Sequence, residues 1–219
     1  MKSFKNIIQN NLWFFVPYLL VLLFALFQVV YENKGDSIKW LDMHAHKTLD
    51  LIFVALTDLG DGLTAALLAL GLLFVQTRKF IGAAIALIFS LIAIGMGKGV
   101  IWHDWERPRK FFESMHQFRE IEGLNYHFMH PMPSGHTTAA FCIFSFLAFV
   151  SIKKTHGYMF FLIAFTVAFS RMYLAQHFLE DVVVGSLLGV LFSMFSYYVF
   201  CQSPLLQNKK WANQPLIKL

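Results

Sequence analysis

Two long apolar runs, GYMFFLIAFTVAF at residues 157–169 and VVVGSLLGVLFSMFSYYVF at residues 182–200, enclose the polar stretch SRMYLAQHFLED at residues 170–181. The rest of the chain alternates in the same way: it is 57% hydrophobic, carries 25 Phe and is only 14% charged. Soluble domains hold about 25% charged residues. A soluble fold of this composition would expose a large apolar surface, so the sequence indicates an integral membrane protein.

Apolar segments long enough to cross a bilayer recur along the chain. A hydrocarbon layer about 30 Å thick needs about 20 helical residues. Six spans are predicted, at residues 12–30, 62–77, 80–97, 135–152, 155–172 and 182–201. The first apolar run is longer than the core of a signal peptide, so we expect a retained anchor.

A further helix is expected between the first two spans. Apolar side chains recur there at helical spacing, which predicts an amphipathic helix in the membrane interface. They are Ile38, Leu41, Ala45, Leu49 and Ile52. The expected fold is therefore all-α, a single domain over residues 1–219 with six transmembrane helices and an interfacial amphipathic helix.

Basic residues predict the orientation. They cluster at Lys2 and Lys5, Arg78 and Lys79, Lys153 and Lys154, and Lys209, Lys210 and Lys218. With six spans these clusters share one side, which the positive-inside rule makes cytoplasmic. All 13 acids, from Glu32 to Asp181, fall on the other side. We expect both termini in the cytoplasm of a bacterium, the chain in its inner membrane, and three polar segments facing the periplasm or exterior. The net charge of +5 then reflects topology, and no nucleic-acid partner is expected.

The polar stretch that ends at Asp181 combines residues suited to phosphate chemistry. Arg171 is expected near the outer interface, where an arginine without a partner is costly and its planar fork suits a phosphate. His177 and Asp181 are four residues apart, so they share a helix face. A carboxylate can hold one ring nitrogen and leave the other free to attack. Taken alone, the pair is explained equally well by a hydrogen bond at the helix start.

Two earlier polar segments carry related features. In HPMPSGHTTAAF (130–141), Ser134 is a good N-cap, Gly135 permits close backbone approach and His136 falls in the first helical turn. A helix N-terminus attracts anions. Lys98 and Arg107 precede it and, taken alone, indicate a snorkelling lysine and a solvated basic loop.

In order, Lys98 with Arg107-Pro108, Pro133-Ser134-Gly135-His136, and Ser170-Arg171 with His177 and Asp181 resemble the three signature motifs of the type 2 phosphatidic acid phosphatase (PAP2) superfamily of integral membrane lipid phosphatases. The motifs span residues 98–181. One spacing departs from the family pattern: eight residues separate Lys98 from Arg107, where the family has six.

The resemblance implies a phosphohistidine mechanism. His177 would attack phosphorus, oriented by Asp181, and His136 would protonate the leaving oxygen. Lys98, Arg107, Ser134, Gly135 and Arg171 would bind the phosphate. No cofactor is expected, and no metal site, because no cluster of acids suits Mg²⁺.

Other candidate ligands receive structural interpretations. His127 and His130 are expected to line the substrate site or to be solvated. His44 and His46 point to different helix faces, so a metal pair is not expected. Cys142 and Cys201 lie in apolar runs and are expected to be small core residues.

The substrate expected at such a site is a lipid phosphate. Candidates are an isoprenyl pyrophosphate, phosphatidylglycerol phosphate, phosphatidate and a lipid A phosphate. Trp102, Trp105, Phe111, Phe112 and Phe118 are expected to line the entrance. Arg109, Lys110 and Arg119 are expected to attract an acidic headgroup.

Three alternatives remain open. A lipid phosphotransferase would use the same phosphohistidine with another lipid as acceptor. A vanadium haloperoxidase has a related anion pocket, but those enzymes are mostly soluble. A non-enzymatic lipid-binding or transport protein would not need His136, His177 and Asp181 at these spacings. The oligomeric state has no signal in the sequence.

Overall fold

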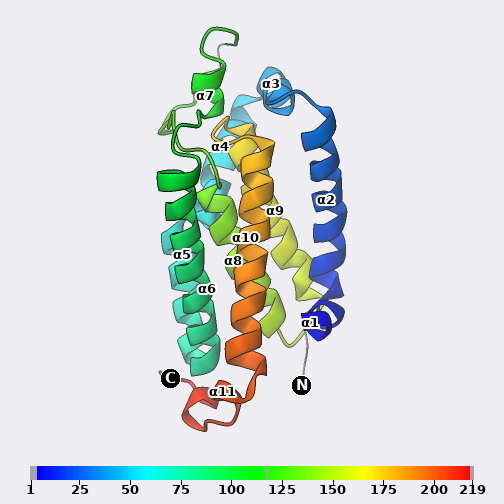
Figure 1. Cartoon of the computed structure of the whole chain (residues 1–219), viewed down its shortest axis with the longest axis vertical. Helices are drawn as coiled ribbons and strands as arrows, with labels where there is room; N and C mark the ends of the chain where they lie inside the picture. The colour runs from blue at the N-terminus through cyan, green and yellow to red at the C-terminus, as the bar shows by residue number, and fades with distance from the viewer. Residues whose placement is uncertain (1–3, 117, 218–219) are drawn as a thin grey trace.

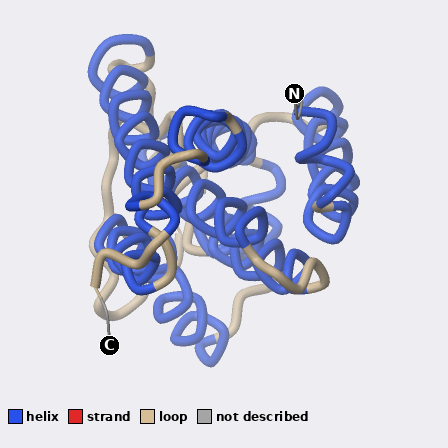
Figure 2. Tube along the Cα trace, turned by 90° about the horizontal axis from the view of Figure 1, so that it is seen from below, coloured by secondary structure: helices blue, strands red, loops and turns tan. Residues whose placement is uncertain are grey.

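Helices joined by loops form the fold in the computed structural model, which describes residues 4–116 and 118–217. The helices are α1 (Phe4–Asn10), α2 (Leu12–Tyr31), α3 (Asp36–Met43), α4 (Lys47–Thr57), α5 (Gly62–Gly71), α6 (Thr77–Met96), α7 (Pro108–Phe111), α8 (Gly135–Val150), α9 (His156–Tyr173), α10 (Leu179–Tyr197) and α11 (Pro204–Gln207). Short turns η1 (Asp58–Gly60), η2 (Leu72–Phe74), η3 (Gly97–Ile101), η4 (Tyr198–Gln202) and η5 (Trp211–Asn213) extend or connect them. Within the described ranges no β-strand forms, which confirms the all-α prediction (Figure 2).

Helix α8 lies at the centre of the bundle, packed against α6, α9 and α10 (Figure 1). Its side chains are buried along nearly its whole length, among them Phe141, Ile143 and Phe146. A helix that is apolar on every face is expected to be buried in this way. Helix α2 lies at the edge of the bundle and leaves large apolar side chains such as Leu20 and Leu23 exposed.

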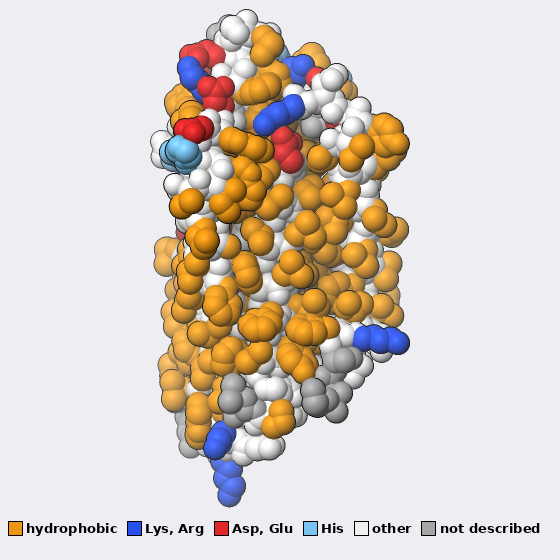
Figure 3. Space-filling view, viewed as in Figure 1, with side chains coloured by type: hydrophobic (Ala, Val, Ile, Leu, Met, Phe, Trp, Pro, Cys, Tyr) orange, Lys and Arg blue, Asp and Glu red, His pale blue; other side chains and the backbone are white. Residues whose placement is uncertain are grey.

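The outer surface is suited to a bilayer. On the face drawn in Figure 3, hydrophobic side chains cover the middle of the molecule and charged side chains gather at its two ends. A monomeric soluble protein rarely exposes an apolar area of that extent. Together with the apolar helices, this surface makes the chain an integral membrane protein.

Helices occupy all six predicted spans, but they differ in length. Among the described residues, three are long and apolar enough to cross a membrane alone: Leu12–Tyr31, Thr77–Ile101 and Leu179–Gln202. Helices α4 and α5 pass the same test only as a pair, bent by 53° at η1. Helix α8 is apolar but has only 16 residues. The count of six crossings therefore stays a prediction.

The predicted interfacial helix is interrupted. Instead of one helix over residues 36–53, α3 ends at Met43 and α4 begins at Lys47. The interruption is stabilised by His46, whose Nδ1 accepts a hydrogen bond from Thr48 N (3.2 Å) and whose own N–H donates to the Tyr173 hydroxyl (3.1 Å). Because of this interruption, the expectation of one continuous helix was wrong. Helix α4 instead continues through the bend at η1 into α5.

The two chain ends lie at the same end of the bundle, opposite α3 and α7 (Figure 1). On the visible face, acids appear only at the end that carries α3 and α7, whereas the opposite end shows basic side chains (Figure 3). Lys2 and Lys218 lie outside the described residues. The polarity agrees with the positive-inside pattern, and the orientation in the membrane remains a prediction.

Candidate active site

A cavity of about 390 Å³ opens between η1, the end of α6, the start of α8 and the turn from α9 to α10. Its wall is formed by Val54, Thr57, Asp58, Lys98, Arg107, Gly123, Leu124, Asn125, His127, Gly135, His136, Arg171 and His177. Six of the eight residues predicted from the motifs are in that wall. The other two, Ser134 and Asp181, are fully buried beside it.

His177 lies in the tight turn between α9 and α10, only 2% exposed. The turn forms because the N–H groups of Gln176 and His177 both donate to Arg171 O, while Ala175 adopts a left-handed φ of 50°. The ring Nε2 lies 3.3 Å from Arg107 Nη1. The turn therefore directs one ring nitrogen of His177 at a cation on the cavity wall.

The other ring nitrogen faces Asp181. His177 Nδ1 lies 3.4 Å from Asp181 Oδ2, without a hydrogen bond between the two atoms. The same Oδ2 accepts a hydrogen bond from Phe178 N at 2.8 Å, which caps the start of α10. The two side chains are adjacent, but they do not share a helix face as predicted, because α10 begins only at Leu179 and Asp181 caps its start.

Burial and positive charge determine the protonation of the turn. Burial, reinforced by Arg107, Arg171 and Lys98, lowers the pKa of His177 well below its ordinary value, so its ring is neutral at neutral pH. Burial also lowers the pKa of Arg107, to about 10, which leaves the guanidinium charged. A neutral imidazole beside a cation has a free lone pair, as a nucleophile needs.

Arg107 is fixed by main-chain oxygens. Its Nε donates to Met129 O (2.8 Å), its Nη1 to Gln176 O (3.2 Å) and its Nη2 to His130 O (3.4 Å). These acceptors carry no net charge, so the positive charge is not cancelled. Arg107 therefore joins the long loop to the His177 turn and presents a cation to the cavity.

Lys98 reaches the cavity from the π turn η3. A π turn holds one more residue than an α-helical turn, and such turns are frequent at functional sites. A methyl group placed on Gly135 would lie 3.7 Å from Lys98 Nζ, so the amine lies at the N-terminus of α8. The longer spacing between Lys98 and Arg107 therefore does not keep Lys98 from the site.

The start of α8 corrects one expectation about Ser134. It is the N-cap residue, but its side chain makes no capping bond to the backbone. Its Oγ instead accepts from Thr137 Oγ1 (2.9 Å), and its N–H donates to Asp181 O (3.1 Å). Ser134 thus ties the start of α8 to the start of α10, and His136 follows it in the first turn.

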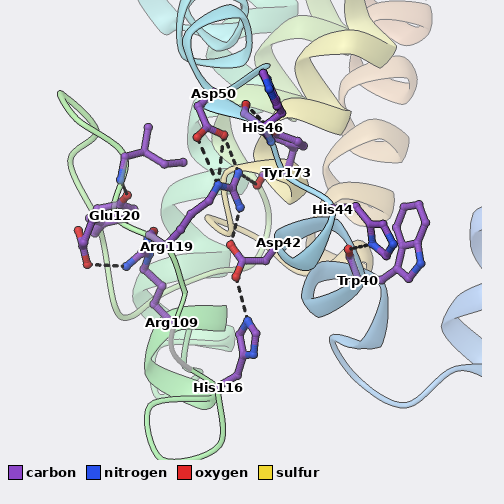
Figure 4. Close-up of polar contacts among 12 residues, drawn as sticks. Trp40, Asp42, His44, His46, Asp50, Arg109, His116, Arg119, Glu120 and Tyr173 are labelled. Atoms are coloured by element: carbon purple, nitrogen blue, oxygen red, sulfur yellow. Dashed lines mark hydrogen bonds and ion pairs between the residues drawn. The ribbon is translucent and has the colours of Figure 1, made fainter. Parts of the chain in front are cut away.

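A loop over residues 119–128 covers one side of the cavity and is held by an ion-pair cluster (Figure 4). Arg119 Nη2 lies 2.8 Å from Asp50 Oδ1, and Nη1 pairs with Asp42. Arg119 Nη2 also donates to Tyr173 O at 3.2 Å, and His116 Nε2 lies 2.9 Å from Asp42 Oδ2. The cluster joins the loop to α3, α4 and α9.

This arrangement corrects the predicted role of the basic loop residues. Arg119 is paired with two acids, Arg109 with Glu120 (3.1 Å) and Lys110 with Glu113 (2.5 Å). Their charges are therefore largely matched within the protein and are not free to attract a headgroup.

The predicted aromatic entrance is only partly present. Phe112 and Phe118 are 4% and 5% exposed and pack with Ile38, Ala175 and Phe178. Trp105 and Phe111 are exposed, but neither side chain is in the cavity wall, so their role at an entrance stays a prediction. The two buried rings instead form a small core beneath the loop.

Six cavity residues had no sequence signal as site residues: Val54, Thr57, Asp58, Gly123, Leu124 and Asn125. Thr57 and Asp58 sit at the α4–η1 junction, far from every motif in the chain. No local pattern reveals that Thr57 has a neighbour 114 residues away in the chain. His127 was expected to line the site, and it does. Among the described residues no three His, Cys, Asp or Glu side chains are grouped so that they could hold a metal ion.

The fold and the cavity together define an all-α membrane protein with a cavity lined by histidines and cationic side chains at one end of its helices. The family model described as the PAP2 superfamily matches residues 83–203, more than half of the chain. This chain belongs to the PAP2 superfamily, which confirms the resemblance of its three motifs.

Known proteins with detectable similarity are consistent with that membership. The chain is 29% identical over 133 residues to the bacitracin transport permease protein BcrC of Bacillus licheniformis, a match that covers 60% of this chain and 64% of that protein.

Two solved structures share the fold. LpxE of Aquifex aeolicus superposes with a TM-score of 0.60 at 24% identity, covering 73% of this chain and 91% of that one. A transmembrane PAP2 type phosphatidylglycerolphosphate phosphatase from Bacillus subtilis superposes with a TM-score of 0.57 at 22% identity, covering 84% and 94%.

Proposed function

We propose that the protein is a membrane lipid phosphatase that hydrolyses a phosphomonoester or pyrophosphate without a metal ion. The observation that carries the proposal is the position of His177: one ring nitrogen lies 3.3 Å from Arg107 and the other 3.4 Å from Asp181, in the wall of a cavity shared with Lys98 and Arg171. The superfamily membership and the fold shared with a transmembrane PAP2 type phosphatase add support.

In the proposed reaction, His177 Nε2 attacks phosphorus and the bond from phosphorus to the lipid oxygen breaks. Asp181 stabilises the positive charge that forms on the ring, and His136 gives its proton to the departing oxygen. Water then attacks the phosphohistidine, His136 takes up a proton, the P–N bond breaks and inorganic phosphate leaves. Phosphoryl transfer depends mainly on positioning and charge stabilisation, which the clamp of Lys98, Arg107 and Arg171 would supply.

The proposed substrate is a lipid whose phosphate lies at the membrane surface while its tails stay in the bilayer. The cavity lies at the end of the bundle with the acidic side chains, which the positive-inside rule places outside. We therefore propose an inner-membrane location, cytoplasmic termini and a site that faces the periplasm or exterior. Isoprenyl pyrophosphate, phosphatidylglycerol phosphate, phosphatidate and lipid A phosphate are the substrates to compare.

Two other functions use the same fold. A phosphotransferase would form the same phosphohistidine and pass it to a second lipid. A transport role deserves a test because the curated relative BcrC is called a transport permease protein. Neither a transporter nor a lipid-binding protein requires the His177–Asp181 pair beside a cationic cavity, and for this reason hydrolysis is favoured.

Phosphate release tests the proposal. Detergent-purified protein with EDTA is given each of the four lipid phosphates, and inorganic phosphate is measured for wild type and His177→Ala. Release by wild type, loss in the variant and retained lipid binding by the variant are expected. Label that appears on an added lipid instead of in free phosphate would establish the phosphotransferase, and equal release by His177→Ala would refute the proposed nucleophile.

A further inference from the structure

The bend between α4 and α5 contacts the phosphate site through Thr57. Arg171 Nη1 donates a hydrogen bond to Thr57 Oγ1 at 2.8 Å, between two side chains that are each 5% exposed. Among the described residues this is the hydrogen bond that holds the Arg171 guanidinium, and its Nε has no partner. Arg171 thus differs from Arg107, whose fork is held by three main-chain oxygens.

The bend is wedged between α8 and α9, which keeps Thr57 in place. A methyl group on Gly60 would lie 2.4 Å from Val167 Cγ1 on α9 and 2.8 Å from His136 O on α8. Such distances are too short for any side chain, so the backbone at Gly60 touches both helices directly. The segment that holds Thr57 therefore has little freedom to move relative to His136 and Arg171.

We propose that Thr57 is a positioning residue of the phosphate site, because it fixes the guanidinium of Arg171 in the cavity wall so that Nη2 is presented to the phosphate. The inference rests on the proposed function. It adds to the three motifs a fourth segment, the α4–η1 junction, from the part of the chain before residue 83 where the family match begins.

The physical reason is the geometry that a guanidinium needs. Its planar fork binds phosphate well only when two N–H groups point at the oxygens together. An arginine on a helix end can rotate about several side-chain bonds, and a buried hydrogen bond to one Nη removes that freedom. Misplacement of a binding group by about 1 Å can lower a rate about 100-fold. The Thr57 hydroxyl accepts from Nη1, Nε is buried, and Nη2 is left for the ligand.

The test is Thr57→Val, which keeps the side-chain shape and removes the hydroxyl, beside Thr57→Ser, which keeps the hydroxyl. We expect Thr57→Val to lower kcat/KM about tenfold or more and to weaken the binding of inorganic phosphate, measured by calorimetry, by a similar factor. Thr57→Ser should remain within about threefold of wild type in both. Thr57→Ala serves as a second variant without the hydroxyl if Thr57→Val does not fold.

The matched control is Thr166→Val, since Thr166 is a half-buried residue of α9 whose hydroxyl donates to Leu162 O within its own helix. It should equal wild type. The proposal is overturned if Thr57→Val binds phosphate as wild type does, or if Thr57→Ser is as weak as Thr57→Val. Absence of phosphate release by wild type would refute the phosphatase, while the binding measurement would still judge Thr57. Wild type that does not bind phosphate would overturn both.

Discussion

Replacing Asp181 by Asn tests how much of the proposed catalysis depends on one buried charge. The asparagine oxygen can still accept from Phe178 N–H, which now donates to Asp181 Oδ2 at 2.8 Å, so the start of α10 should stay intact. The side chain keeps its size and loses its negative charge. The variant therefore separates the electrostatic role of Asp181 from its role in holding the helix.

The magnitude follows from the distance between Asp181 and His177. Two unit charges 3.4 Å apart attract by about 5 kcal/mol at an effective dielectric constant of 20. The Phe178 N–H and Arg107 already offset part of the negative charge of Asp181. We therefore expect Asp181→Asn to lose about 3 to 4 kcal/mol of stabilisation when the His177 ring becomes positively charged in the phosphohistidine. Since about 1.4 kcal/mol is a factor of ten in rate, kcat should fall about 150- to 900-fold.

The assay is the steady-state release of inorganic phosphate together with a single-turnover measurement of label bound to the protein. We expect slower formation of the labelled intermediate and an unchanged thermal midpoint within a few degrees. The control is Glu180→Gln: this neighbouring acid is 3.4 Å from Lys34, and its side chain is 25% exposed, so it should change kcat less than twofold. Asp181→Asn within about tenfold of wild type would refute the role assigned to the carboxylate.

Three further predictions concern the parts that surround the site. Gly60→Ala should lower stability by about 1 to 3 kcal/mol because its methyl group meets His136 O at 2.8 Å, whereas Gly62→Ala should not, because the space around Gly62 is open. Thermal melting in detergent compares the two variants. Equal midpoints would contradict the close packing of Gly60 against α8 and α9. The pKa of His177 is lowered in the fold, so below about pH 6.5 the folded state binds fewer protons than the unfolded state, and stability should fall as the pH drops, by up to about 1.4 kcal/mol per pH unit. In a melting series from pH 7 to 5, the dependence of the melting midpoint on pH should be weaker for His177→Gln than for wild type. Parallel curves for the two proteins would refute the neutral ring. Arg119→Gln should lower stability by about 2 kcal/mol and speed proteolysis of the 119–128 loop, because the carboxylates paired with Arg119 lose their cation. Arg119→Lys should be intermediate in both measurements. Unaltered proteolysis of Arg119→Gln would show that the ion pairs do not hold the loop.

The sequence alone was sufficient for the class of fold and for most of the cavity wall. Long apolar runs have few alternatives in a membrane, because helices satisfy their own backbone hydrogen bonds there. The helix period predicted one helix face for His177 and Asp181, which is wrong because α10 begins only at Leu179. The ends of the apolar runs placed Lys98, His136 and Arg171 at a similar depth. In the structure the last three line one cavity with His177, and Asp181 is packed behind it.

Most of the wrong predictions concern polar residues that bond to other polar residues far away in the chain. The apolar pattern of residues 36–53 continues through His44 and His46, but the bond from His46 to Tyr173 breaks the helix. Arg119 looked like a free surface cation until Asp42 and Asp50 were found beside it. Both depend on partners about 70 or more residues away, and no local pattern encodes such pairs.

Periodicity and spacing thus determined that this is a helical membrane protein with three cationic and histidine-containing motifs at one end. Only the tertiary structure decided which groups hold those motifs in place. Thr57 reaches Arg171 because the α4–α5 bend packs between α8 and α9, and this packing follows from the shapes of three helices at once. A spacing rule describes neighbours along one helix, whereas the orientation of a buried guanidinium depends on whichever hydroxyl another helix brings to it.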